Sequence, residues 1–147
     1  MRFTTKTEYG LVCLVYLAKR PLGQMVTVRD VASDEHYSPA FAEKIFQRLR
    51  SAKIVTSHQG KQGGYTLARP PAEITLREII EALDGETFKV FCEPRTRETI
   101  VCTHFSTDMC LVSPVWMRTK EVLDHFFGSI SLEMLANGKY GSDRASA

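Results

Sequence analysis

The first part of the chain carries helical apolar periodicity. A mostly apolar stretch from Tyr9 to Ala18 follows Thr4, and it predicts a helix over about 4–19 that is buried on more than one side. Thr27 is a suitable N-cap for a second, short helix over about 28–35. The sequence therefore opens with a buried helix followed by a short one.

A clearer amphipathic pattern lies over about 39–52. Ser38 is a good N-cap, and Pro39 fits the first helical position. With residues placed about 100° apart, the apolar side chains fall within one arc and the polar ones opposite. The apolar arc holds Phe41, Ala42, Ile45, Phe46 and Leu49. This pattern predicts a helix that packs on the core and presents a polar face.

Two short stretches with strand periodicity follow this helix, at 54–58 and 65–69. They flank QGKQGG, whose three glycines allow the positive φ angles of a hairpin tip. Pro70 and Pro71 then end the second strand. The pattern predicts a β-hairpin.

The second half begins with a helix that starts at Thr75 and stops at Gly85. Residues 86–112 have weak periodicity, and loops of that length are often functional or disordered. A long helix is predicted from 113 to about 136. Its apolar stripe is too large to leave in water on a monomer, and so predicts a dimer interface of Trp116, Leu123, Phe127 and Ile130.

This order of elements predicts a mainly α fold with a small β-hairpin wing, namely a winged helix-turn-helix plus a long C-terminal dimerisation helix. We divide the chain into a DNA-binding domain (1–85), a cysteine-rich sensor loop (86–112), a dimerisation helix (113–137) and a disordered tail (138–147).

The chemistry of the polar helix face and of the hairpin suits double-stranded DNA. Gln47 and Ser51 can pair with base edges, and basic side chains can reach phosphates. The alternative is a solvated helix face beside a plain hairpin. The candidate DNA contacts are Lys44, Gln47, Arg48, Arg50 and Ser51 on the helix, and His58, Lys61 and Gln62 on the wing.

Charge distribution favours the DNA interpretation. The net charge is +2, yet residues 1–71 hold 11 basic and 5 acidic side chains, whereas residues 72–147 hold 8 and 12. A basic half beside an acidic half suggests that one half meets a polyanion. Because the chain lacks both an apolar run of about 18 residues and a signal-peptide stretch, we expect a cytoplasmic protein without a membrane partner.

Three of the four cysteines, Cys92, Cys102 and Cys110, lie within 19 residues. In a cytosolic chain such a cluster is more often metal-binding or redox-active than a structural disulfide set. A thiol–disulfide switch, a zinc site and three unrelated thiols remain open. Cys13 lies alone in an apolar stretch and is expected in the core.

Three segments of the chain resemble the IscR/NsrR/RirA family of bacterial winged-helix regulators. They are MRFTTKTEYGLVCLVYLA, VTVRDVASDEHYSPAFAEKIFQRLR and, most specifically, QGKQGGYTLARPP before an isoleucine-rich helix. The likeness is close over about 1–85 and organisational over 86–136. It implies a homodimer joined by the C-terminal helix. It also implies an iron–sulfur cluster, [2Fe–2S] or [4Fe–4S], held by Cys92, Cys102 and Cys110.

The resemblance leaves the fourth ligand open. In the NsrR branch an acidic residue at the start of the first helix of the partner subunit supplies it, and Glu8 matches that place. His104 is the local alternative, although no histidine closely follows Cys110. A further branch uses two cysteines with Glu and His from the first helix, but Val12 stands at the histidine position.

The sequence therefore predicts a DNA-binding repressor that senses nitric oxide, iron or redox state by losing or changing its cluster, which shifts the spacing of the two reading heads. A cluster-free thiol sensor on the same fold is the milder alternative. An enzyme or electron carrier is the rival from another class. The sequence contains no nucleotide-binding loop, acid–base pair or substrate-pocket signature that would support this rival, and so we expect that the protein is not an enzyme.

Overall fold

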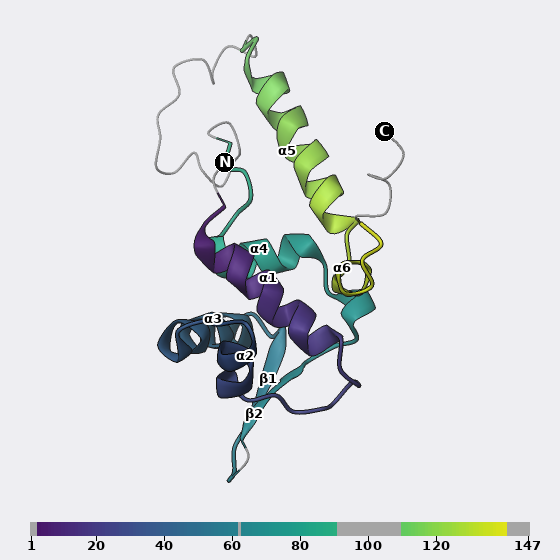
Figure 1. Cartoon of the computed structure of the whole chain (residues 1–147). Coiled ribbons are helices and arrows are strands. Elements are labelled where there is room, and N and C mark those ends of the chain that lie inside the picture. The colour runs from purple at the N-terminus through teal and green to yellow at the C-terminus, as the bar shows by residue number, and fades with distance from the viewer. Residues whose placement is uncertain (1–2, 62, 91–109, 141–147) are drawn as a thin grey trace.

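The computed structural model describes residues 3–61, 63–90 and 110–140. Its elements follow one another from the N-terminus as drawn in Figure 1. They are α1 (Thr5–Ala18), α2 (Val28–Asp34), α3 (Pro39–Ser51), β1 (Val55–His58), β2 (Gly64–Leu67), the short 3₁₀ helix η1 (Pro71–Glu73), α4 (Leu76–Asp84), α5 (Ser113–Gly128) and α6 (Leu132–Ala136).

The helix boundaries follow from local capping chemistry. Thr27 and Asp30 form a capping box at the start of α2, and Thr75 and Glu78 form another at the start of α4. Each pair satisfies two backbone N–H groups that the first turn leaves without partners. Gly85, with φ 87°, ends α4 in a conformation that disfavours other residues.

One hydrophobic core joins α1, α3, α4 and the hairpin. The apolar arc of α3 lies in it, because Ala42, Ile45, Phe46 and Leu49 are all buried. Cys13 of α1 is fully buried among these side chains, as the sequence predicts. Burial raises the pKa of the Cys13 thiol to about 12, so this cysteine is a packing residue and not a thiolate at neutral pH.

The hairpin pairs β1 and β2 antiparallel, from Val55 opposite Leu67 to His58 opposite Gly64. Backbone hydrogen bonds join Val26, just before α2, to Tyr65 of β2 in both directions. A Cβ atom on Gly64 would lie only 2.6 Å from the Val26 carbonyl oxygen. Glycine is therefore required at position 64 for the backbone of Val26 to pack this closely against the hairpin. The mainly α fold with a hairpin wing is confirmed.

The C-terminal region differs from the single helix predicted over 113–136. α5 ends at Gly128, and α6 begins only at Leu132. Between them, Leu76 donates a backbone hydrogen bond to the Ile130 carbonyl (2.8 Å), and Leu132 donates one to Ile74 (2.8 Å). The break occurs because Gly128 is a weak helix former and these tertiary bonds, with the Ser131 N-cap of α6, replace the helical ones.

The last helix ends at Ala136, where the sequence predicts the end of the C-terminal helix. Asn137 is the C-cap of α6, and Gly138 has φ 67°. Residues 138–140, assigned from the sequence to a disordered tail, form a turn in which Lys139 donates to the Met134 carbonyl. Residues 141–147 lie outside the described part of the chain.

Candidate nucleic-acid interface and sensor region

The polar face of α3 is open to solvent, and every helix residue that the sequence selected for DNA lies on its exposed surface. These residues are Lys44, Gln47, Arg48, Arg50 and Ser51. In Figure 1, α3 and the hairpin lie at the end of the molecule away from the N-terminal end of α5. A helix exposed in this way can enter a DNA major groove.

Neighbouring contacts hold several of these side chains. Gln47 donates from Nε2 to Glu43 Oε1 (3.5 Å), and Ser51 donates to the Gln47 carbonyl (3.0 Å). Arg50 donates to Ser57 Oγ of β1 at 3.5 Å, which links the helix to the wing. Arg48 donates from Nη1 to the Leu83 carbonyl of α4 at 3.1 Å. Arg48 therefore has a partner within its own chain.

On the wing, His58 and Lys61 are exposed, and Gln62 lies outside the described residues. The His58 ring nitrogen Nε2 lies 2.9 Å from Thr66 Oγ1 on the paired strand. Gly60 has φ 143°, which a side chain would disfavour. The tip therefore presents a lysine beside small residues that allow close backbone approach.

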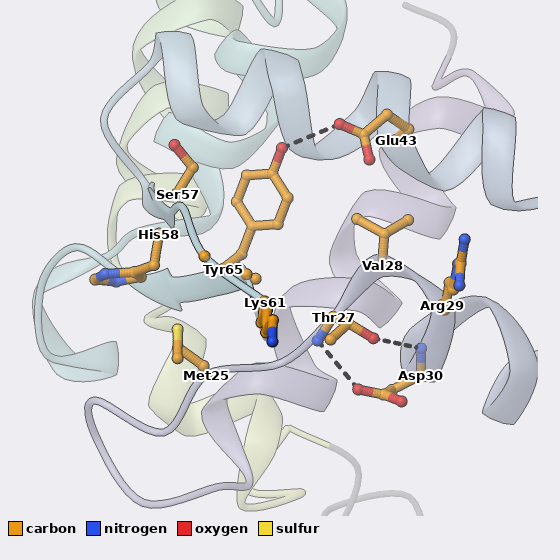
Figure 2. A pocket seen from close by; sticks show the side chains of 13 residues that line it. Met25, Thr27, Val28, Arg29, Asp30, Glu43, Ser57, His58, Lys61 and Tyr65 are labelled. Atoms are coloured by element: carbon orange, nitrogen blue, oxygen red, sulfur yellow. Dashed lines mark hydrogen bonds between the residues drawn. The ribbon is translucent and has the colours of Figure 1, made fainter.

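A hollow of about 760 Å³ lies between the wing, α2 and α3 (Figure 2). Tyr65 points from β2 toward α3, where its hydroxyl donates to Glu43 Oε1 (3.2 Å). The Tyr65 ring stacks on Phe46 with centroids 4.7 Å apart. Burial and the Glu43 carboxylate raise the pKa of Tyr65, so it remains a neutral donor. Sequence reasoning did not select Glu43 or Tyr65 as site residues.

The predicted sensor residues are only partly described. Glu8 lies exposed in the first turn of α1, and Cys110 is half-buried just before α5. Cys92, Cys102 and His104 lie outside the described residues. Within residues 3–61, 63–90 and 110–140 no group of three or more metal-ligating side chains is found.

Asp84 ties the start of α1 to the end of α4. Its carboxylate accepts hydrogen bonds from the Thr4 backbone N–H (2.9 Å), from Thr4 Oγ1 (2.5 Å) and from Thr7 Oγ1 (2.6 Å), and Lys6 Nζ lies 3.5 Å away. Burial alone would raise the pKa of Asp84, but the bonds from Thr4 and Thr7 and the Lys6 charge lower it to about 2. No local sequence signal predicts this contact, because its partners lie on different helices.

Asp124 of α5 forms a second junction. It accepts from Thr87 Oγ1 (3.0 Å) and pairs with Lys120 (3.2 Å) and Arg77 of α4 (3.4 Å). The Lys120 and Asp124 side chains are only 15% and 16% exposed, so this pair is shielded from solvent. These bonds fix α5 to α4 and to the residues that follow α4.

The predicted interface stripe is divided by the structure. Trp116 is 46% exposed and Leu123 is half-buried. Phe127 and Ile130, 7% and 2% exposed, are buried within their own chain, and Phe127 packs edge-to-face on Phe3. The helix break and the packing of α5 on α4 turn this part of the stripe inward. The large apolar side chains that α5 and the two residues before it leave exposed are Leu111, Val112, Val115, Trp116, Val122 and Phe126.

Together, the helical pair α2–α3, the hairpin and the exposed α3 face define a winged-helix regulator of transcription. A model of the Rrf2 family, described as an iron-dependent transcriptional regulator, matches residues 3–138. The chain belongs to the Rrf2 family. The resemblance seen in the sequence is confirmed.

Individual relatives agree with this assignment. An HTH-type transcriptional regulator of Mycobacterium tuberculosis is 38% identical over 85 residues, which cover 58% of this chain and only 53% of that relative's length. The regulator IscR of Photorhabdus laumondii is 30% identical over 139 residues, or 95% of this chain and 81% of IscR. The structure of CymR, the global cysteine regulator of B. subtilis, superimposes with a TM-score of 0.74 at 27% identity, covering 93% of this chain and 97% of CymR.

These relatives are transcriptional regulators and not enzymes, as the sequence predicts. Among the described helices, none combines the length and apolarity that crossing a bilayer would require.

Proposed function

We propose that this protein is a homodimeric repressor that binds a pseudo-palindromic double-stranded operator and that an iron–sulfur cluster controls its affinity. The observation that carries the DNA-binding part is the exposed polar face of α3 beside a lysine-tipped hairpin, in a chain of the Rrf2 family. Such a protein acts on the chromosome, which places it in the bacterial cytoplasm.

On the operator, α3 enters the major groove. Gln47 and Ser51 read base edges, since amide and hydroxyl groups can both donate and accept. Lys44 and Arg50 contact phosphates and set the register, and Arg48 was selected from the sequence for the same purpose. Lys61, with His58 and Gln62, brings the wing to the flanking backbone.

A second copy of the chain covers the exposed apolar side of α5. Val115 and Val122 are seven residues apart, and Trp116 and Phe126 widen the same strip. A strip of this kind is costly to leave in water and self-complementary in a two-fold dimer. Two reading heads related by that symmetry would face successive major grooves of a palindromic site.

Cys92, Cys102 and Cys110 hold the cluster, with Glu8 of the partner subunit as the fourth ligand and His104 as the local alternative. Soft thiolates suit an iron–sulfur cluster, and Cys110 and Glu8 are both reachable at the surface, unlike Cys13. The iron-dependent description of the family and the likeness to IscR support the presence of a cluster. When bound, the cluster supplies a tie between the subunits that redox change or nitric oxide can break.

A cluster-free thiol sensor on the same fold is the second candidate. The likeness to CymR supports it, because one of the similar solved structures is described as an oxidized form of Staphylococcus aureus CymR. In that case an external oxidant would convert pairs of the thiols of Cys92, Cys102 and Cys110 to disulfides, and this oxidation would weaken DNA binding without any role for iron.

The proposal is tested by selecting duplexes from a random library with the wild-type protein, prepared with and without anaerobic iron and sulfide. We expect a two-fold symmetric consensus whose affinity falls steeply with salt, since phosphate neutralisation releases counterions. Failure to enrich any sequence under both conditions would contradict the DNA-binding function. Enrichment that is identical in both, but lost on thiol oxidation, would favour the second candidate.

A further inference from the structure

The end of α4 is held from two sides by residues distant in sequence. Arg48 of α3 donates from Nη1 to the Leu83 carbonyl at 3.1 Å. The next residue, Asp84, accepts the hydrogen bonds from Thr4 and Thr7 at the start of α1. The contact to α3, which we call the reading helix, and the contact to α1, the helix that carries Glu8, are therefore made by adjacent residues of α4.

The hydrogen bond from Arg48 satisfies a backbone carbonyl at the C-terminal end of α4. The last carbonyls of a helix lack intrahelical partners, and a basic side chain there also complements the helix dipole. On the side where α3 and α4 face each other, a groove of about 560 Å³ is lined by Lys44, Arg48 and Ala82, among others. Arg48 reaches α4 from this groove.

The Asp84 side of the junction adjoins a second hollow. A cavity of about 260 Å³ is lined by Phe3, Ile80, Asp84 and residues 85–89, which lead toward the cysteine-containing part of the sequence. Thr87, in this same stretch, donates to Asp124 of α5. The start of α1, the residues after α4 and α5 thus all meet within a few residues of the Leu83 carbonyl.

We infer that Arg48 is a positioning residue that couples the placement of α1 and of the residues after α4 to the reading helix, acting through the Leu83 carbonyl and not through a DNA phosphate. This inference rests on the proposed DNA-binding function. A shift of the α1 start moves Asp84, and Asp84 cannot move without Leu83, since the two share a peptide bond. Arg48 then transmits the shift to α3.

Lys44 provides the contrast. It lies one turn before Arg48 on the same helix and is exposed. A phosphate contact at either position gives the same signature, namely weaker binding to all duplexes and a salt slope reduced by about one unit. A positioning role gives weaker binding with the salt slope unchanged.

The experiment measures dissociation constants by fluorescence anisotropy against the selected duplex, at four salt concentrations, for wild type, Arg48→Ala, Asp84→Asn, the double variant and Lys44→Ala. Glu81→Gln, one turn earlier on α4 and paired with Arg77, is the matched control for the loss of a carboxylate. Thermal unfolding of each variant sets a temperature at which all are folded, and Arg48→Lys, a milder change, replaces Arg48→Ala if the latter does not fold.

We expect Arg48→Ala and Asp84→Asn each to weaken binding about two- to thirty-fold with an unaltered salt slope. The double variant should be no weaker than the weaker single one, because both changes cut the same connection. A slope reduced by about one unit in the Arg48 variant, as in Lys44→Ala, or fully additive losses in the double variant, would overturn the inference. Absence of DNA binding by the wild type would instead count against the proposed function.

Discussion

Thr4 and Asp84 stand eighty residues apart in the chain, yet Asp84 accepts hydrogen bonds from both the backbone N–H and the hydroxyl of Thr4. Thr4 is the N-cap residue of α1, and its own side chain does not cap the helix. The carboxylate of α4 therefore does the capping from a distance and places a negative charge at the positive end of the α1 dipole.

This arrangement predicts how stability depends on pH. The pKa of Asp84 is lowered in the folded state from the ordinary 3.8 to about 2. The stabilisation is therefore fully present above about pH 4 and is lost as the pH falls toward 2. We expect Asp84→Asn to lower the free energy of unfolding by about 2 kcal/mol at pH 7 and by progressively less below pH 4.

Urea unfolding of both proteins between pH 7 and pH 3 checks this expectation. Glu73→Gln, on the exposed 3₁₀ helix η1, serves as the control and should change little at any pH. A difference between wild type and Asp84→Asn that stays constant down to pH 3 would show that the Asp84 charge is not what stabilises the junction.

The wing and the reading helix should respond differently to substitution. Lys61→Ala should weaken binding to all duplexes alike and reduce the salt slope by about one unit, because a phosphate contact carries no sequence information. Gln47→Ala should leave the slope unchanged and relax preference at one base step by about 1–3 kcal/mol. Anisotropy titrations on the selected duplex and its single-base variants measure both effects. If neither variant departs from wild type, α3 and the wing are not the DNA surface.

The proposed homodimer should dissociate when a charged side chain is introduced into its apolar interface. Val122 is 52% exposed in the single chain, so Val122→Asp should fold normally but sediment as a monomer, because the dimer would bury an unpaired carboxylate. Glu121→Gln, the adjacent exposed residue, is the control and should remain dimeric. Sedimentation equilibrium at micromolar concentration measures the mass. A monomeric wild type would contradict the dimer proposal.

Local signals in the sequence were sufficient to predict the helices and the hairpin within residues 1–85. Ser38 and Pro39 mark the start of α3, Gly85 marks the end of α4, and the apolar arc of α3 identifies its buried side. Each of these features depends on residues within one or two turns. For this reason hydrophobic periodicity and capping predict them without knowledge of the rest of the chain.

Tertiary contacts decided the features that the sequence did not reveal. The break after Gly128 depends on backbone bonds between Ile130 and Leu76 and between Leu132 and Ile74, which no local pattern encodes. Because of the same break, Ile130 is buried within its own chain, and the apolar side chains that remain exposed on α5 include Val122. Asp84 was likewise unremarkable in sequence, and Arg48 was predicted to contact DNA, because the partners that these two side chains have in the structure lie on other helices.

The most direct test of the central claim follows cluster content and operator affinity in one anaerobic preparation. We expect a brown protein after reconstitution with iron and sulfide, bleached by Ala at Cys92, Cys102 or Cys110, left labile by Glu8→Ala and unaffected by Cys13→Ala. Removing the cluster should change the operator dissociation constant by at least about tenfold, which lies in the lower part of the usual range of coupling free energies. A colourless reconstituted protein, or a coloured one whose affinity is the same with and without its cluster, would contradict control by an iron–sulfur cluster.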